Sequence, residues 1–440
     1  MRSFRYLFHL SSAFINRFKV ILLIGIFLGV GVFFLVGFVA SVAFGRSTER
    51  IGVSGRFHTD SLPPFILNMV SDGLTKLNEA GTPEPNLASS WETPDKGKTW
   101  IFHLREGRLW QDSKPLGSST IVYEYSDVNI ERPDEATIVF KLENPFAPFP
   151  VVVSRPTFRK GLLGVGEWKV KEITLVGQYV SELTLVNSKK DKKIFKFYPT
   201  LERTKLAFKL GEVDKIINIF DASPFVSWNN VKIEELVNFD QVTTLFFNTT
   251  DALFSEKSLR QALVYALDRP SLSEAAAISS ISPNSWAFNP QTKEYNYDPK
   301  RAQELIEGLP DEVREKLEVK LATVPILLPV AEKIAKNWEA AGVKTTIQVS
   351  SIIPSEFQVF LAIFDIPKDP DQYSIWHSTQ VATNISSYSN PRIDKLLEDG
   401  RIELDSNERR KTYLDFQRFL SEDLPAAFLY HPTYYTISRK

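Results

Sequence analysis

The sequence predicts an α/β protein of two lobes that face each other across a cleft. The first lobe is expected to be β-rich and the second α/β, and one transmembrane helix is expected to precede both. Residues 20–45 carry no charged side chain. Residues 51 to about 250 contain short β-branched and aromatic runs separated by turn residues. Beyond about residue 250, helical periodicity alternates with strand-like segments, which is typical of an α/β unit.

The uncharged run 20–45 is long enough to cross a bilayer, because a helix rises about 1.5 Å per residue and the hydrocarbon layer is about 30 Å thick. The residues before it are basic and include no acid: Arg2, Arg5, Arg17 and Lys19. Those after it have mixed sign: Arg46, Glu49 and Arg50. The positive-inside bias then predicts a cytoplasmic segment 1–19, a single-pass anchor 20–45 in the cell membrane, and an extracytoplasmic C-terminal part.

A cleaved signal peptide is the alternative for this run, since Ser41 and Ala43 have the small-x-small spacing of a cleavage site. The apolar region of a signal peptide is only about 7 to 15 residues long, which favours the anchor. The chain contains no cysteine, so disulfides, thiolate catalysis and lipid attachment through an N-terminal cysteine are excluded. A protein tethered outside the cell without that lipid would need a hydrophobic anchor of its own.

Composition and motifs exclude several other function classes. Lys plus Arg (52) balances Asp plus Glu (53) without a basic block, so no nucleic-acid partner is expected. None of the five His lies in a His-Glu-x-x-His motif, and no Gly-x-Ser-x-Gly elbow occurs. A phosphate loop ending in 97–99 would need glycine where Glu92 lies, and a dinucleotide motif from Gly164 would need glycine at Lys169. We therefore expect no catalytic residue, no metal site and no cofactor.

Lobe I is expected to comprise residues 46–245. Its predicted strands include 100–104, 137–142, 168–170 and 193–198, with a turn at 94–97. Lobe II is expected to comprise residues 246–424, and residues 425–440 are expected to return to lobe I. The predicted helices of lobe II begin near Ser255, as a capping residue, and near 298, 329, 391 and 408, with strands at 343–349 and 427–430.

The densest polar segment of the chain is 365–378. It contains three carboxylates: Asp365, Asp369 and Asp371. Three further candidate ligand-binding residues follow them: Trp376, His377 and Ser378. Carboxylates beside aromatic side chains, directly after the apolar segment 357–364, suit the capture of a cationic group in a cleft. A solvated acidic turn is an equal alternative. Paired carboxylates can also hydrolyse glycosides, but only where two of them face each other across a substrate.

Several segments together carry a resemblance to a known family: 71–74, 85–92, 100–107, 247–250, 259–269, 286–290 and 369–371. In their order and spacing, across most of residues 70 to 435, the chain resembles the family 5 extracellular solute-binding proteins, the peptide-binding components of ABC importers. The resemblance implies a two-lobed periplasmic-binding-protein-like fold of type II that closes around an extended peptide.

The resemblance also implies site residues. Backbone at Asp72, Gly73 and Leu74 would come from lobe I; Trp286, Asp365, Asp369, Asp371, Trp376, His377 and Ser378 would face it from lobe II. The family's amine-binding aspartate lies three residues before the acid of its Asp-Pro pair, whereas Asp365 lies four before Asp369. Asp365 is therefore the first candidate and Asp369 the second. The chain between Ser118 and Phe140 is short, which implies a reduced accessory subdomain near 105–150.

The sequence thus predicts a membrane-tethered, monomeric solute-binding protein, not an enzyme. It would capture peptides in the interlobe cleft and deliver them to an ABC transporter permease. One alternative keeps the fold but changes the solute to a nickel chelate, haem, an opine or an oligosaccharide. The other is an ectoenzyme, such as a glycosidase using Asp365, Asp369 or Asp371.

Overall fold

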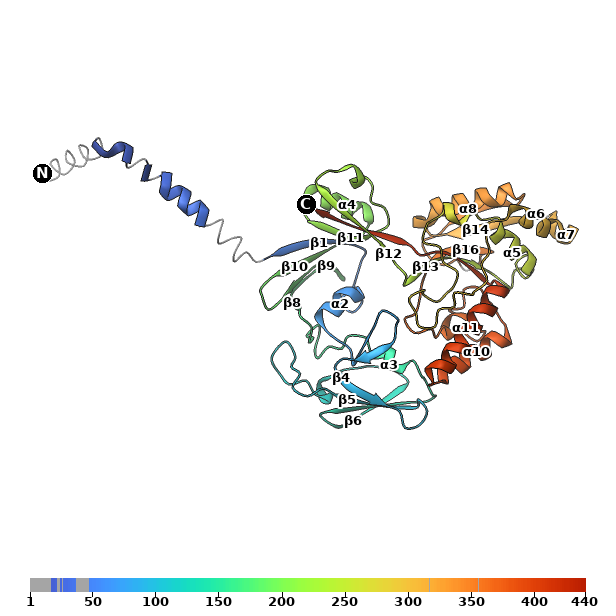
Figure 1. Ribbon diagram of the computed structural model, residues 1–440, viewed down its shortest axis with the longest axis horizontal. Coiled ribbons are helices and arrows are strands. Elements are labelled where there is room, and N and C mark those ends of the chain that lie inside the picture. Colours follow the sequence, from blue (N-terminus) through green and yellow to red (C-terminus); the bar gives the residue numbers. More distant parts are fainter. Residues whose placement is uncertain (1–16, 22–23, 26, 37–46, 316, 355) are drawn as a thin grey trace, which may run out of the picture.

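The computed structural model describes residues 17–21, 24–25, 27–36, 47–315, 317–354 and 356–440. From residue 47 the chain forms two lobes (Figure 1). The described residues between 17 and 36 are helical. Within the described ranges, no helix combines the length and apolarity needed to span a membrane. Residues 22–23, 26 and 37–45 of the predicted anchor lie outside those ranges, so the anchor stays a prediction.

Lobe I is built on a large sheet with the strand order β12-β18-β11-β1-β10-β9-β8. Its strands are β1 (Thr48–Ser54), β8 (Lys169–Val176), β9 (Tyr179–Val186), β10 (Lys192–Tyr198), β11 (Lys215–Ile219), β12 (Val231–Val237) and β18 (Thr433–Arg439). Strand β1 pairs in parallel with both β10 and β11. Helix α4 (Leu201–Leu210) connects β10 to β11; it is capped by the Thr200 hydroxyl and ends at Gly211, which has a left-handed φ of 78°.

A small sheet with the order β4-β5-β7-β6 completes lobe I, together with the hairpin β2-β3. The bounds are β2 (Thr75–Leu77), β3 (Pro83–Pro85), β4 (Ala88–Glu92), β5 (Thr99–Leu104), β6 (Val128–Asp134) and β7 (Thr137–Leu142), with helices α2 (Pro64–Val70) and α3 (Phe149–Val152). Along β5, Trp100, Phe102 and Leu104 are buried and alternate with more exposed residues. This period of two places one face of the sheet on the core.

Lobe II is an α/β unit around a sheet with the order β15-β14-β16-β13-β17. Its strands are β13 (Gln241–Phe247), β14 (Glu318–Thr323), β15 (Lys344–Val349), β16 (Val359–Asp365) and β17 (Ala426–Tyr430). Its helices are α5 (Lys257–Tyr265), α6 (Pro299–Glu307), α7 (Asp311–Arg314), α8 (Leu328–Ala340), α9 (Tyr373–Trp376), α10 (Pro391–Ile402) and α11 (Ser406–Asp423). Asp298, Asn390 and Asp405 cap α6, α10 and α11 with their side chains.

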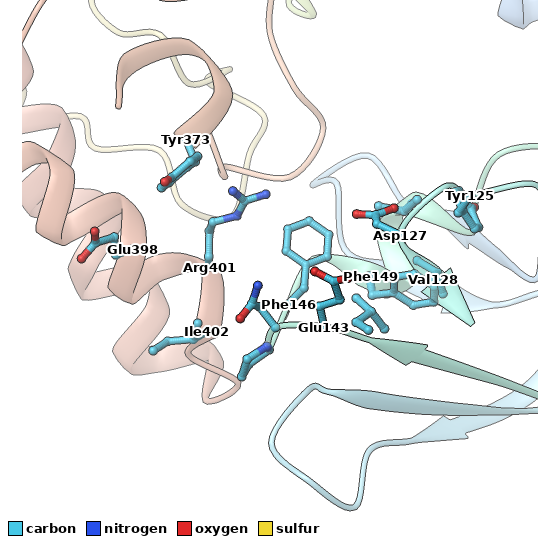
Figure 2. Close-up of a pocket in the computed structure, with 14 residues that line it drawn as sticks. Tyr125, Asp127, Val128, Glu143, Phe146, Phe149, Tyr373, Glu398, Arg401 and Ile402 are labelled. Atoms are coloured by element: carbon cyan, nitrogen blue, oxygen red, sulfur yellow. The ribbon is translucent and has the colours of Figure 1, made fainter. Parts of the chain in front are cut away.

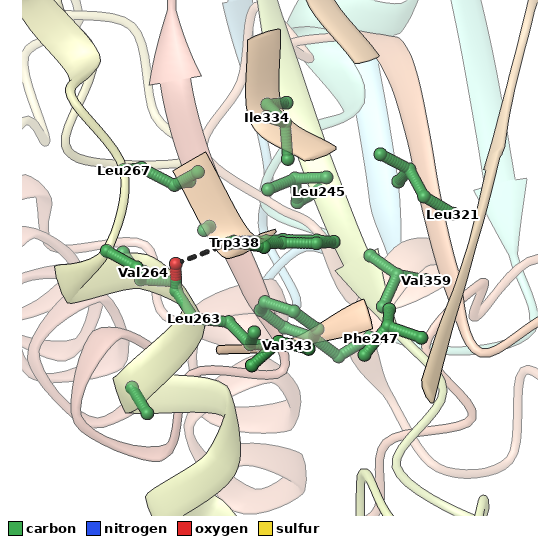
Figure 3. Close-up of a cluster of buried hydrophobic side chains, with 14 of the residues drawn as sticks. Leu245, Phe247, Leu263, Val264, Leu267, Leu321, Ile334, Trp338, Val343 and Val359 are labelled. Atoms are coloured by element: carbon green, nitrogen blue, oxygen red, sulfur yellow. Dashed lines mark hydrogen bonds between the residues drawn. The ribbon is translucent and has the colours of Figure 1, made fainter. Parts of the chain in front are cut away.

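Trp338 of α8 is at the centre of the larger core of lobe II (Figure 3). Its side chain is fully buried, and its indole nitrogen donates a 2.8 Å hydrogen bond to the carbonyl of Leu263 in α5. Leu245 and Phe247 of β13 pack beside it. The hydrogen bond satisfies a polar group that would otherwise be buried unpaired, so one tryptophan joins both helices to the sheet.

The chain crosses from lobe I to lobe II between β12 and β13, at 238–240, and returns between β17 and β18, at 431–432. The sheet of lobe II therefore begins a few residues before the expected boundary at 246, and it includes β17, which was expected in the returning segment from 425. Both strands belong to lobe II because they pair with each other in its sheet: β13 lies between β16 and β17, and β17 forms the edge.

Candidate ligand-binding site

A cavity of about 600 Å³ lies between the lobes (Figure 2). Lobe I contributes the residues around Phe146, and lobe II contributes Tyr373 and the C-terminal part of α10. Acidic side chains also line it: Asp127, Glu143 and Glu398. Because both lobes form its walls, the shape of this interlobe cavity depends on how the lobes are arranged.

Arg401 of α10 connects the lobes at this cavity. Its guanidinium carbon lies 4.9 Å from the ring centre of Phe146 in lobe I and 4.4 Å from that of Tyr373 in lobe II. Its Nε lies 3.2 Å from Oδ2 of Asp371, and its carbonyl accepts a 2.7 Å hydrogen bond from the amide of Ala147. Burial raises the pKa of Asp371, and the charge of Arg401 opposes this. The Asp371 carboxylate is thus already paired, within lobe II, with the arginine that contacts lobe I.

A second cavity, of about 380 Å³, opens on lobe II beside β16. Its walls are mainly apolar and include Val324, Ile352, Ile353, Phe364 and Ile385. Asp365, the last residue of β16, is the one charged residue among the described residues that line it. We call this cavity the β16 groove. Ile352 and Ile353 are 75% and 54% exposed, so the groove is open to solvent.

Asp369 is held in a buried ion pair. Its carboxylate accepts hydrogen bonds from both terminal nitrogens of Arg409 on α11, at 2.8 and 2.5 Å, and the residue is 8% exposed. Burial lowers the pKa of Arg409, but the charge and hydrogen bonds of Asp369 outweigh this effect and raise it above the ordinary value. This bidentate pair fixes the segment after β16 on α11, and its buried guanidinium already balances the charge of Asp369.

Asp365 differs from the other two carboxylates. It is exposed, and its Oδ1 accepts a 2.6 Å hydrogen bond from the side-chain nitrogen of Gln241. No basic side chain in the described part of the chain forms an ion pair with it. Asp365 is therefore the carboxylate of the predicted segment that is free to bind a cation.

The three residues predicted after the carboxylates support the fold of their segment. Trp376 is buried in the second core of lobe II and donates a 2.8 Å hydrogen bond to the side chain of Gln372. The buried ring of His377 stacks on Tyr373 at 4.0 Å. Ser378 donates to Asp394 through both its hydroxyl, at 2.6 Å, and its amide, at 2.9 Å. These contacts hold the segment against α10.

On the lobe I side, Asp72, Gly73 and Leu74 lie against residues of lobe I. Leu74 is fully buried, and its amide donates a 2.9 Å hydrogen bond to the carbonyl of Val153. The carbonyl of Asp72 accepts one from the amide of Thr157. The backbone of these residues is thus largely committed within lobe I. In this part of lobe I, the β2–β3 loop contacts lobe II: the carbonyl of Ala80 accepts a 3.2 Å hydrogen bond from the amide of Trp286.

Gly73 is required by close backbone packing, because a Cβ at this position would lie 2.4 Å from the carbonyl carbon and oxygen of Ser154. We expect Gly73→Ala to lower the free energy of unfolding by about 1 to 3 kcal/mol, since backbone on both sides would have to move. Gly308→Ala is the matched control, because its Cβ would meet nothing closer than 3.4 Å. Equal thermal unfolding midpoints for the two variants would contradict this account.

Sequence reasoning missed Gln241, Phe146 and Arg401, which lie far along the chain from the residues they contact. It also missed Ile352 and Ile353, although two adjacent apolar residues between Ser351 and Pro354 are a visible signal of an exposed apolar surface. Within the described ranges, no three His, Asp or Glu side chains are grouped so that they could hold a metal ion.

Two lobes around an interlobe cavity, linked by the crossings 238–240 and 431–432, form the fold that the class of two-lobed solute-binding proteins adopts. Solved structures share this fold. NikZ from Campylobacter jejuni in complex with Ni(L-His) superposes with a TM-score of 0.73 at 21% identity, covering 89% of this chain and 94% of that one. The oligopeptide-binding protein AppA from Bacillus subtilis in complex with a nonapeptide gives a TM-score of 0.70 at 21% identity, covering 90% and 95%.

The sequence places the chain within this class. It belongs to the bacterial extracellular solute-binding proteins, family 5, because the family model described as "Bacterial extracellular solute-binding proteins, family 5 Middle" matches residues 82–380. In sequence, the chain is 23% identical to AppA of Bacillus subtilis over 86% of this chain and 83% of that protein. The expected family and two-lobed fold are thereby confirmed.

Proposed function

We propose that this protein binds peptides that have a free α-amino group and an apolar first side chain, without transforming them, and delivers them as a monomer to an ABC transporter permease. The observation that carries this proposal is the exposed, unpaired carboxylate of Asp365 at the end of the apolar β16 groove. A peptide N-terminus matches this pairing, since its ammonium group lies one carbon away from its first side chain.

The energetics of the β16 groove support this solute. An ammonium group gains a charge-assisted hydrogen bond from the free carboxylate. An apolar side chain gains by leaving water against Ile352, Ile353 and Phe364. Relatives support the same class: AppA of Bacillus subtilis is named an oligopeptide-binding protein, and its structure holds a nonapeptide.

We further propose that residues 20–45 anchor the protein in the cell membrane, with residues 1–19 in the cytoplasm and the lobes outside. The run is uncharged, and its described part exposes large apolar side chains, with Phe27 and Phe33 each 75% exposed. A hydrocarbon environment would cover these side chains. Anchoring would also hold the binding lobes at a high effective concentration near a permease in the same membrane.

The test is calorimetric titration of the purified full-length protein with trileucine, N-acetyl-trileucine and triglutamate. We expect trileucine to bind most tightly and N-acetylation to weaken binding by at least about tenfold, because it removes the charge that pairs with Asp365. Triglutamate should bind most weakly, since its carboxylates would enter an apolar groove beside a like charge. If folded protein retains none of these peptides but binds nickel–histidine, the peptide proposal is wrong.

A further inference from the structure

Gln241 lies where the chain enters lobe II. It is the first residue of β13, follows the crossing 238–240, and pairs directly with Asp365 of β16 in the sheet register. The returning crossing lies beside it: the imidazole Nδ1 of His431 is 2.7 Å from the Gln241 carbonyl. A carbonyl only accepts hydrogen bonds, so this ring nitrogen must be the donor. Gln241 is therefore in contact with both segments that link the lobes, through Asn238 and His431.

The side-chain amide of Gln241 makes three hydrogen bonds. Its nitrogen donates to Oδ1 of Asp365 at 2.6 Å. Its oxygen accepts from the hydroxyl of Tyr434 on β18, and from the side-chain nitrogen of Asn238 at 3.1 Å. The carboxylate can only accept, so the amide must turn its nitrogen to Asp365 and its oxygen to Tyr434. The amide thus joins a carboxylate of lobe II to a tyrosine of lobe I.

We infer that Gln241 is a positioning residue for solute capture: its amide orients Asp365 in the β16 groove and connects this carboxylate to Tyr434 of lobe I. This inference rests on the proposed function, in which Asp365 binds the cationic group of the solute. Gln241 occupies one carboxylate oxygen, and Oδ2 has no hydrogen-bond partner among the described residues. That oxygen is left to accept from a ligand ammonium in a fixed direction.

Tyr434 is well suited to hold the Gln241 amide. Its ring packs on Phe220 with a centroid distance of 4.5 Å, so the hydroxyl is fixed from the lobe I side. Burial, together with the negative charge of Asp365, raises the pKa of Tyr434 to about 12. The hydroxyl therefore keeps its proton at neutral pH and remains a donor to Gln241. The orientation of Asp365 then depends on the relative position of the lobes.

Binding measurements on the full-length chain test this assignment. Gln241→Met keeps the length of the side chain but removes the amide, and we expect it to weaken trileucine binding by about tenfold. Binding of N-acetyl-trileucine should not change, since that peptide carries no ammonium group for Asp365. Gln291→Met is the matched control, because the Gln291 side chain is exposed and makes no hydrogen bond in the described part of the chain. Equal losses for both peptides would assign Gln241 a purely structural role and overturn the inference.

Tyr434→Phe tests the connection to lobe I. Because Tyr434 acts through Gln241, we expect Tyr434→Phe to weaken trileucine binding by about threefold in the otherwise unchanged protein. In a protein that already carries Gln241→Met, the same substitution should have no effect on trileucine binding. Additive losses would overturn the connection.

A ligand-free measurement separates failure of the inference from failure of the proposed function. The side-chain amide resonances of Gln241, assigned by their loss in Gln241→Met, should shift in both Asp365→Asn and Tyr434→Phe. Resonances unmoved in either variant would refute the network, whether or not trileucine binds. If trileucine fails to bind the unchanged protein, the proposed function fails, and these resonances alone decide whether Gln241 connects Asp365 to Tyr434.

Discussion

Asp365→Asn is expected to weaken trileucine binding by roughly 1.5 to 3 kcal/mol, because the peptide ammonium would lose its opposing charge and its charge-assisted hydrogen bond in the β16 groove. Asparagine has almost the same shape as aspartate, and its side-chain oxygen can still accept the hydrogen bond from Gln241. The substitution therefore removes charge while preserving the groove. Calorimetric titration of both proteins gives the difference directly.

The N-acetylated peptide and an unrelated aspartate provide the controls for this loss. N-acetyl-trileucine lacks the ammonium, so its weaker binding should be the same in both proteins. Asp60→Asn changes an exposed aspartate of lobe I and should leave trileucine affinity unchanged. An equal loss for the free and acetylated peptides would mean that Asp365 shapes the groove rather than pairing with the amine.

Local patterns in the sequence were sufficient for much of the fold. The alternation along β5 and the capping residue Asp298 are local signals, and strand and helix occur there as predicted. The first helix of lobe II shows the limit of such signals. Ser255 was expected to cap it, but the helix begins at Lys257, and the Ser255 hydroxyl donates a 3.0 Å hydrogen bond back to the carbonyl of Ala252. A serine hydroxyl can cap a helix or bond back to a preceding carbonyl, so the presence of a serine does not decide between these two hydrogen bonds.

The binding site was less accessible from sequence, because its chemistry depends on distant partners. Asp365, Asp369 and Asp371 look alike along the chain. The structure separates them through Arg409 and Arg401, which neutralise the last two, and through Gln241, which leaves the first unpaired. Arginines on two later helices give no sign in the sequence of which carboxylate they approach. The apolar character of the β16 groove likewise comes from segments that meet only in the folded lobe.

The buried ion pair leads to the other large expected effect. Arg409→Met should lower the free energy of unfolding by about 3 to 5 kcal/mol, because Asp369 would remain buried without its partner. The carbonyl of Gly400, which accepts a 2.7 Å hydrogen bond from Nε of Arg409, would also lose its donor. Chemical denaturation followed by tryptophan fluorescence measures this loss.

Arg418→Met on the same helix is the matched control, since its ion pair with Asp415 is exposed and contributes little. The double variant Arg409→Met/Asp369→Leu should regain much of the lost stability, because removing both charges leaves neither one unpaired in the interior. If the double variant were as unstable as the single one, the loss would arise from packing around the Arg409 side chain rather than from a stranded carboxylate. In that case the assignment of Asp369 to structure, which leaves Asp365 for the ligand, would lose its energetic basis.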